Sequence, residues 1–75
     1  MMTYINRLLL DAYREECYDK MYIEKLEKEL SSDDNKYDSL LRLYSVGDRI
    51  RKRMAIKLNC TYNELNTFLS VLKNT

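Results

Sequence analysis

Two carboxylates three residues apart, Glu16 and Asp19, are the side chains best suited to acid–base chemistry in this chain of 75 residues. Such a pair can serve as general acid and general base. The chain has no histidine, so it lacks the commonest general base and the commonest metal ligand. No nucleophile or set of metal ligands accompanies the pair. We therefore expect Glu16 and Asp19 to form a structural polar layer with Arg51, in a protein that is not an enzyme and has no cofactor.

Two heptad repeats indicate the elements that would hold this layer in place. The first repeat spans residues 5–30 and is apolar at both ends, and the second spans residues 37–58. Between them lies a short polar segment, 31–35, rich in residues that cap helices. When the chain folds back at this segment, the apolar rows meet and the two carboxylates come opposite Arg51.

The expected fold is all-α, because the chain has no proline and one glycine. It is an antiparallel two-helix coiled-coil hairpin with a short third helix packed on it, in a single domain (1–75). The expected helices cover about 4–30, 36–59 and 62–73. The third begins at a capping box, Thr61–Glu64.

Asp19 leaves a second interpretation open for the first helix, because aspartate is a common N-cap residue. In that interpretation the helix breaks near Tyr18 and a new helix begins after Asp19. The heptad keeps its phase through this region, which favours one long helix.

Residues 54–65 resemble the core of a helix-turn-helix motif. Ala55 stands where that family has a small residue that permits close helix crossing, and Leu58 and Leu65 stand where apolar residues pack between the helices. Asn59 stands where glycine is usual. The resemblance implies DNA contacts from the third helix and phosphate contacts from the end of the second. The residues concerned are Arg53, Lys57, Tyr62, Asn63, Asn66 and Thr67.

Charge is distributed unevenly along the chain. Residues 1–38 hold ten Asp and Glu against six Lys and Arg, whereas residues 39–75 hold two against seven. This asymmetry indicates either an interaction surface or two halves that neutralise each other. The basic run 49–57 likewise either contacts phosphates or pairs with carboxylates of the first helix. Both pairs of alternatives stay open.

A second apolar strip lies beside the seam of the first helix and needs cover from another element or another molecule. We expect the partner-binding residues to come from this strip, its flanking carboxylates and two leucines near the C-terminus. They are Leu10, Tyr13, Glu15, Cys17, Met21, Glu24, Leu69 and Leu72. Cys17 and Cys60 are expected to be free thiols, as is usual in a reduced cytoplasmic protein.

In size and composition the chain resembles small helical inhibitor proteins of phages that infect Gram-positive bacteria. Residues 69–72 also resemble the tail of the short motif by which replication proteins bind the bacterial sliding clamp. These resemblances imply a homodimer in the host cytoplasm that binds and inhibits or regulates a host protein machine of replication or transcription, with the clamp as one partner. The alternative function is a small helix-turn-helix regulator that binds DNA. Neither function involves a membrane.

Overall fold

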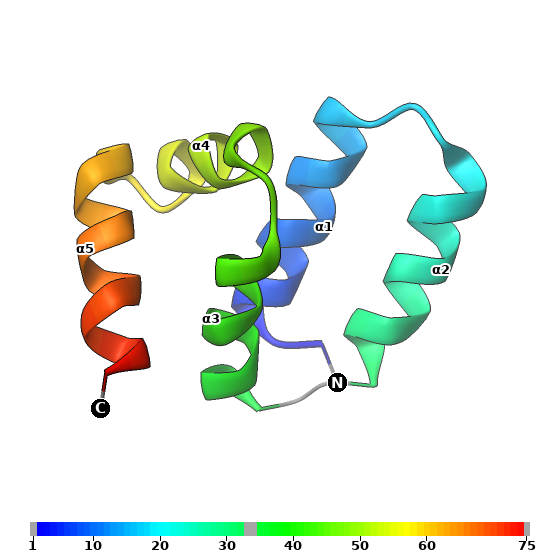
Figure 1. Cartoon of the computed structure of the whole chain (residues 1–75). Helices are drawn as coiled ribbons and strands as arrows, with labels where there is room; N and C mark the ends of the chain where they lie inside the picture. The colour runs from blue at the N-terminus through cyan, green and yellow to red at the C-terminus, as the bar shows by residue number, and fades with distance from the viewer. Residues whose placement is uncertain (1, 33–34, 75) are drawn as a thin grey trace.

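The computed structural model describes residues 2–32 and 35–74, and these ranges contain five helices (Figure 1). They are α1 (Tyr4–Glu16), α2 (Lys20–Ser31), α3 (Lys36–Ser45), α4 (Asp48–Lys57) and α5 (Tyr62–Lys73). The predicted all-α class is confirmed. The predicted arrangement of three helices is wrong, because each of the two long helices is broken in the middle.

The first break lies between α1 and α2, where Asp19 acts as an N-cap. Its Oδ1 atom accepts a hydrogen bond of 3.1 Å from the backbone N–H of Tyr22. The backbone is extended at Cys17 and at Asp19. Aspartate is unfavourable inside a helix and favourable at a cap, since its carboxylate satisfies an N–H that has no partner in the first turn. The capping interpretation is therefore correct, and the single long helix over 4–30 is wrong.

The second break lies between α3 and α4, inside the predicted helix 36–59. Val46 and Gly47 are both extended, with ψ of 153° and 164°. Glycine is a poor helix former, and Gly47 becomes the N-cap of α4. The side chain of Val46 is buried, which anchors the connection in the core.

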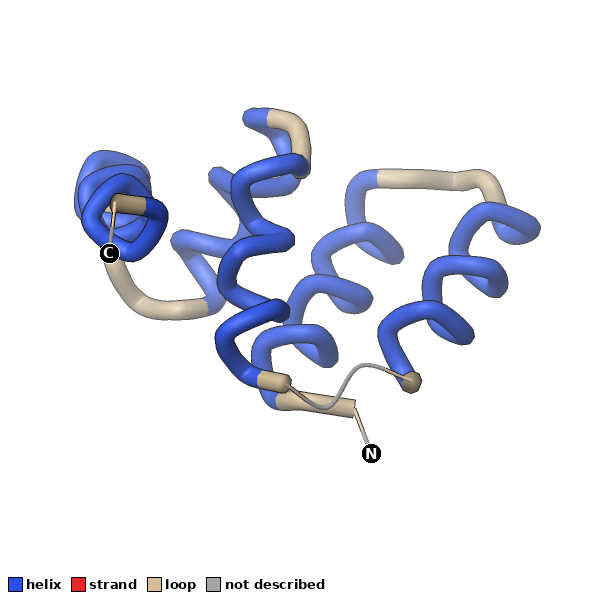
Figure 2. The backbone as a smooth tube through the Cα atoms, turned by 60° about the horizontal axis from the view of Figure 1, so that its bottom comes forward, coloured by secondary structure: helices blue, strands red, loops and turns tan. Residues whose placement is uncertain are grey.

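Three of the other four helices pack against α1. Helix α1 contacts α2, α3 and α4, and α5 packs against α3 and α4. Figures 1 and 2 show α2 and α5 at opposite ends of the molecule. Helix α1 does contact α4, but the predicted two-helix hairpin is wrong as an arrangement. It is wrong for the second half of the first predicted helix, because α2 folds back onto α1.

Two buried polar side chains fix α1 against its neighbours. The amide of Asn6 donates to the carbonyl of Leu30 at 3.3 Å, which ties α1 to the end of α2. The hydroxyl groups of Thr3 and Ser39 lie 2.7 Å apart, which ties the start of α1 to α3. None of the helices that the structure describes combines the length and apolar character that crossing a bilayer requires.

Candidate functional site

The turn between α4 and α5 is the one that the resemblance to a helix-turn-helix motif predicted. Helix α4 ends in a Schellman motif: the N–H of Cys60 donates to the carbonyl of Ala55 at 3.0 Å, and the N–H of Asn59 donates to the carbonyl of Ile56 at 3.1 Å. Asn59 has a φ of 60°, in the left-handed region that glycine adopts freely and asparagine tolerates. Asparagine therefore takes the place of the usual turn glycine.

Helix α5 begins at the predicted capping box. The hydroxyl of Thr61 accepts from the N–H of Glu64, and the carboxylate of Glu64 accepts from the N–H of Thr61, both at 3.0 Å. The backbone hydrogen bond from Thr61 lowers the pKa of Glu64, because it stabilises the ionised carboxylate. Ala55 and Leu65 are buried beside the turn, so α4 and α5 form one packed unit. This α4–α5 unit comprises residues 48–73.

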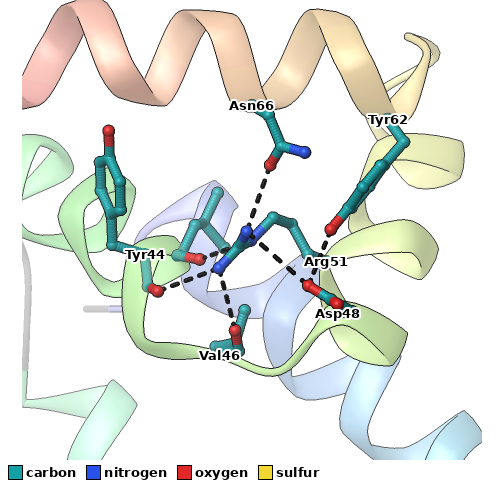
Figure 3. Close-up of polar contacts among 7 residues, drawn as sticks. Tyr44, Val46, Asp48, Arg51, Tyr62 and Asn66 are labelled. Atoms are coloured by element: carbon teal, nitrogen blue, oxygen red, sulfur yellow. Dashed lines mark hydrogen bonds and ion pairs between the residues drawn. The ribbon is translucent and has the colours of Figure 1, made fainter.

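Arg51 joins this unit to α3 (Figure 3). Its Nε donates to the carbonyl of Leu43 at 3.2 Å, and its Nη2 donates to the carbonyls of Tyr44 at 3.0 Å and Val46 at 3.1 Å. Carbonyl groups at the C-terminus of a helix lack hydrogen-bond donors within the helix, and the guanidinium group of Arg51 supplies these donors. The Nη1 atom donates to the side-chain oxygen of Asn66 at 3.2 Å. Arg51 thus holds the end of α3, α4 and α5 together.

These contacts show that the predicted layer of Glu16, Asp19 and Arg51 is wrong. Asp19 caps α2, and Arg51 bonds to α3 and α5. Glu16 instead accepts from Arg53, with 2.8 Å between Nη2 and Oε1, and pairs with Arg49, with 3.2 Å between Nε and Oε2. The layer required two continuous helices, and the breaks change which residues face one another.

The basic run of α4 pairs largely with carboxylates of α1 in the folded chain. Besides the two arginines on Glu16, Lys57 places its Nζ 2.8 Å from Oε2 of Glu15. This hydrogen-bonded pair lowers the pKa of Glu15. Lys52 has a different neighbour, the ring of Tyr62, whose centroid lies 5.5 Å from its Nζ. The predicted partner-binding residue Glu15 and the predicted DNA-binding residue Lys57 are therefore bound to each other.

The remaining predicted DNA-binding residues divide into two groups on α5. Asn63 and Thr67 are exposed on its outer face. Asn66 accepts the hydrogen bond described above, and the hydroxyl of Tyr62 donates to Oδ1 of Asp48 at 2.8 Å (Figure 3). Only the first group is free to meet a ligand directly, and the second group positions α5.

A second candidate surface is the corner between α1 and α2. Tyr18 is 93% exposed and Met21 is 82% exposed, which is unusual for large apolar side chains. A hollow of about 470 Å³ lies beside Tyr18, which is one of the residues that line it. The residues that line this hollow are Arg14, Cys17, Tyr18, Lys20, Ile23, Glu24 and Glu27. We call these seven residues and Met21 the α1–α2 corner.

The predicted partner-binding residues lie partly in this corner and partly in the core. Leu10 and Leu69 are 4% and 1% exposed, so neither can contact a partner. Residues 69–72 lie within α5, which removes the support that this segment gave to the sliding clamp as partner. The ring of Tyr13 packs against the ring of Tyr22, with 5.8 Å between the two ring centroids. Burial raises the pKa of Tyr13 to about 12. Of the predicted residues, Cys17 and Glu24 line the hollow, and Met21 is exposed beside Lys20 of that lining.

Two functional features were absent from the sequence prediction: the exposed position of Tyr18 and the role of Arg51 as a link between helices. The signal for Tyr18 was its place just before a capping aspartate, because a side chain in a helix-breaking loop is often exposed. Cys17 and Cys60 are free thiols. Among the described residues, no group of three or more His, Cys, Asp or Glu could hold a metal ion. No family model, curated protein or solved structure matches this chain.

Proposed function

We propose that this protein is a small, non-enzymatic regulator that binds duplex DNA through its α4–α5 unit. The observation that carries the proposal is the left-handed turn at Asn59, which joins α4 to a capped α5 in the order and spacing of a helix-turn-helix motif. In such motifs the second helix enters the major groove with its N-terminal residues against base edges. Asn63 and Thr67 lie on the exposed face of that helix.

The side chains on this face suit particular base edges. An asparagine amide can bond to both N6 and N7 of adenine, and a threonine can contact any base through its hydroxyl or the thymine methyl group through its own methyl. Val71, one helical turn after Thr67, is 60% exposed and can add an apolar contact of the same kind. The exposed face of α5 carries no arginine, the residue that most often reads guanine. We therefore expect a preference for A·T pairs.

The charge of this half of the chain also favours a polyanion. Residues 36–74 hold eight Lys and Arg against three Asp and Glu. Arg49 is 80% exposed and Lys52 is exposed, so both can approach phosphates. Arg49, Arg53 and Lys57 already pair with carboxylates of α1, but ion pairs at a protein surface are weak and phosphates can compete for them.

The test is fluorescence anisotropy with duplexes that have a randomised centre, followed by selection of the bound sequences. We expect binding that weakens with salt and enrichment of A·T-rich sites. Asn63→Ala should weaken binding to the selected site by about tenfold while leaving binding to unrelated duplexes unchanged. Lys52→Ala should weaken binding to all duplexes and reduce the slope of the salt dependence by about one.

Lys25→Ala is the matched control for Lys52→Ala, because Lys25 is an exposed lysine on α2, at the opposite end of the molecule from α5. It should change neither affinity nor salt slope. The proposal is overturned if no duplex binds at low salt, or if Lys25→Ala and Lys52→Ala have equal effects.

A second candidate function is inhibition or regulation of a host protein machine, which the resemblance to phage proteins implies. The observation that favours it is the α1–α2 corner, where the predicted residues Cys17 and Glu24 line one hollow with the exposed Tyr18, and the predicted residue Met21 is exposed. Exposed tyrosine and methionine beside a hollow are typical of protein-binding surfaces. Affinity capture from a Gram-positive lysate tests this function. One captured protein that Tyr18→Ala releases, together with the absence of DNA binding, would favour it over the first.

A further inference from the structure

We infer that the α1–α2 corner binds a second copy of this chain around a two-fold axis. This interface goes beyond DNA binding, since it involves the opposite end of the molecule from α5 (Figure 1). It also differs from the second candidate function in its occupant, which is this chain and not a host protein. Shape, charge and position each support it.

The shape of the corner is self-complementary. Tyr18 protrudes from it and also borders the hollow of about 470 Å³, and Met21 is exposed next to Lys20, another residue of the lining. A two-fold interface uses the same patch on both subunits, so each patch must contain both a projection and the cavity that receives it. The cavity is large enough to accept the side chain of Tyr18 or Met21, and Cys17 and Ile23 give it an apolar lining.

The charges of the corner are self-complementary as well. Lys20 and Glu24 lie one helical turn apart on the rim of the hollow, and among the residues that the structure describes neither has an ion-pair partner. A two-fold axis perpendicular to α2 reverses the direction of that helix in the second copy. Lys20 of each copy then faces Glu24 of the other, so the four charges that are unpaired in two separate chains form two ion pairs in the dimer.

The position of the corner makes this dimer compatible with the proposed function. Helices α2 and α5 lie at opposite ends of the molecule (Figures 1 and 2). Two chains joined at their corners therefore leave both α4–α5 units uncovered. Helix-turn-helix proteins commonly use such dimers to bind two half-sites of one operator.

Sedimentation equilibrium of charge-reversed variants tests the inference. Lys20→Glu alone makes a carboxylate face a carboxylate at both contacts of the dimer, and Glu24→Lys alone makes an ammonium group face an ammonium group. Each single variant should therefore raise the dimer dissociation constant by about tenfold or more. An equimolar mixture of the two variants allows a heterodimer in which one chain has carboxylates at positions 20 and 24 and the other has ammonium groups at both. Both contacts of that heterodimer are therefore ion pairs, so the mixture should associate with about the affinity of the unmodified chain, and a mixture that associates no better than the single variants would overturn the assigned pairing.

The double variant Lys20→Glu with Glu24→Lys restores both ion pairs with their signs exchanged. We expect it to form a homodimer with about the affinity of the unmodified chain. This recovery is the result that a general loss of stability or of net charge cannot produce, because the double variant carries both substitutions and has the net charge of the unmodified chain.

Variants at the apolar projections test the other half of the contact. Tyr18→Ala and Met21→Ala should each raise the dimer dissociation constant by about tenfold or more. Tyr4→Ala, at an exposed tyrosine of α1 outside the corner, is the matched control and should leave it unchanged. The inference is overturned if the unmodified chain keeps the 9.1 kDa mass of one chain up to millimolar concentration, or if the double charge variant does not associate.

The same variants separate this inference from the proposed function. Binding to a duplex with one half-site needs only one α4–α5 unit, so Tyr18→Ala should retain it. A monomer that binds one half-site overturns the dimer and leaves the proposed function standing. A dimer that binds no DNA supports the interface and overturns the function. A monomer whose corner retains a host protein assigns the corner to that protein and overturns the dimer.

Discussion

Replacing Arg51 should destabilise the fold more than replacing any other basic residue of α4. The guanidinium makes four hydrogen bonds of 3.0–3.2 Å, three of them to carbonyls at the end of α3, and its side chain is only 17% exposed. Hydrogen bonds to a charged group contribute about 1.5–3 kcal/mol each, but desolvation of the guanidinium offsets much of their sum. We therefore expect Arg51→Met to lower the free energy of unfolding by about 3 kcal/mol.

That loss is large for a chain of 75 residues. Small domains have free energies of unfolding of about 0.05–0.15 kcal/mol per residue, or roughly 4–11 kcal/mol for this length. The melting temperature should fall by about 12–24 °C, since 1 kcal/mol shifts it by about 4–8 °C in domains of this size. Urea unfolding followed by far-ultraviolet circular dichroism measures the first quantity, and thermal unfolding measures the second.

Two further variants distinguish the network from a general effect of charge. Arg51→Lys should recover less than half of the loss, because one ammonium cannot reach both the α3 carbonyls and Asn66 as the guanidinium fork does. Arg49→Met removes an arginine from the same helix whose side chain is 80% exposed, and it should change stability by less than about 1 kcal/mol. Equal losses for Arg49→Met and Arg51→Met, or full recovery by lysine, would refute the assigned role of Arg51.

Three other predictions concern single residues. Because Asn59 has a φ of 60°, Asn59→Gly should raise the free energy of unfolding by up to about 1 kcal/mol and Asn59→Ala should lower it by about 1 kcal/mol. Urea unfolding checks both variants, and an alanine variant more stable than the unmodified chain would contradict the left-handed turn. Glu64→Gln should destabilise the chain at neutral pH, and melting curves should show the difference disappearing as pH falls below 4.5, since the lowered pKa stabilises the fold only while the carboxyl is ionised. Stability should decrease as pH rises from 10.0 to about 12, because the folded chain keeps the Tyr13 proton that the unfolded chain releases; a Tyr13→Phe variant with an equally steep decrease would exclude Tyr13 as the cause.

The sequence predicted the α4–α5 unit well because the signals for that unit are local. The capping box determines where α5 begins, and Asn59 determines how α4 ends; both act within a few residues of the turn. The expected helix over 62–73 accordingly matches α5. The role of Arg51 could not be predicted in this way, because it depends on Asn66 and on the end of α3, which only the folded chain brings together.

The partner-binding residues were predicted less well because periodicity cannot show which apolar face remains uncovered. Leu10 belongs to a strip that needs a partner in a continuous helix, and in the folded chain the helices packed on α1 bury it. Leu10 is 4% exposed, whereas Met21, just after the bend, is 82% exposed. The same heptad pattern would have left all of the strip uncovered in a continuous helix.

Asp19 and Gly47 explain how a wrong hairpin could be consistent in register. The heptad interpretation placed these two residues opposite each other, and each is in fact an N-cap. A polar residue in a coiled-coil seam either finds a partner across the interface or ends the helix, and a cap avoids the cost of burying a carboxylate. Both breaks lie at similar distances along the chain from residues 32–35. The two N-cap residues therefore fall opposite each other in the heptad pattern, as two members of one polar layer would. Heptad positions held by aspartate or glycine should therefore be tested as helix ends before they are interpreted as layers.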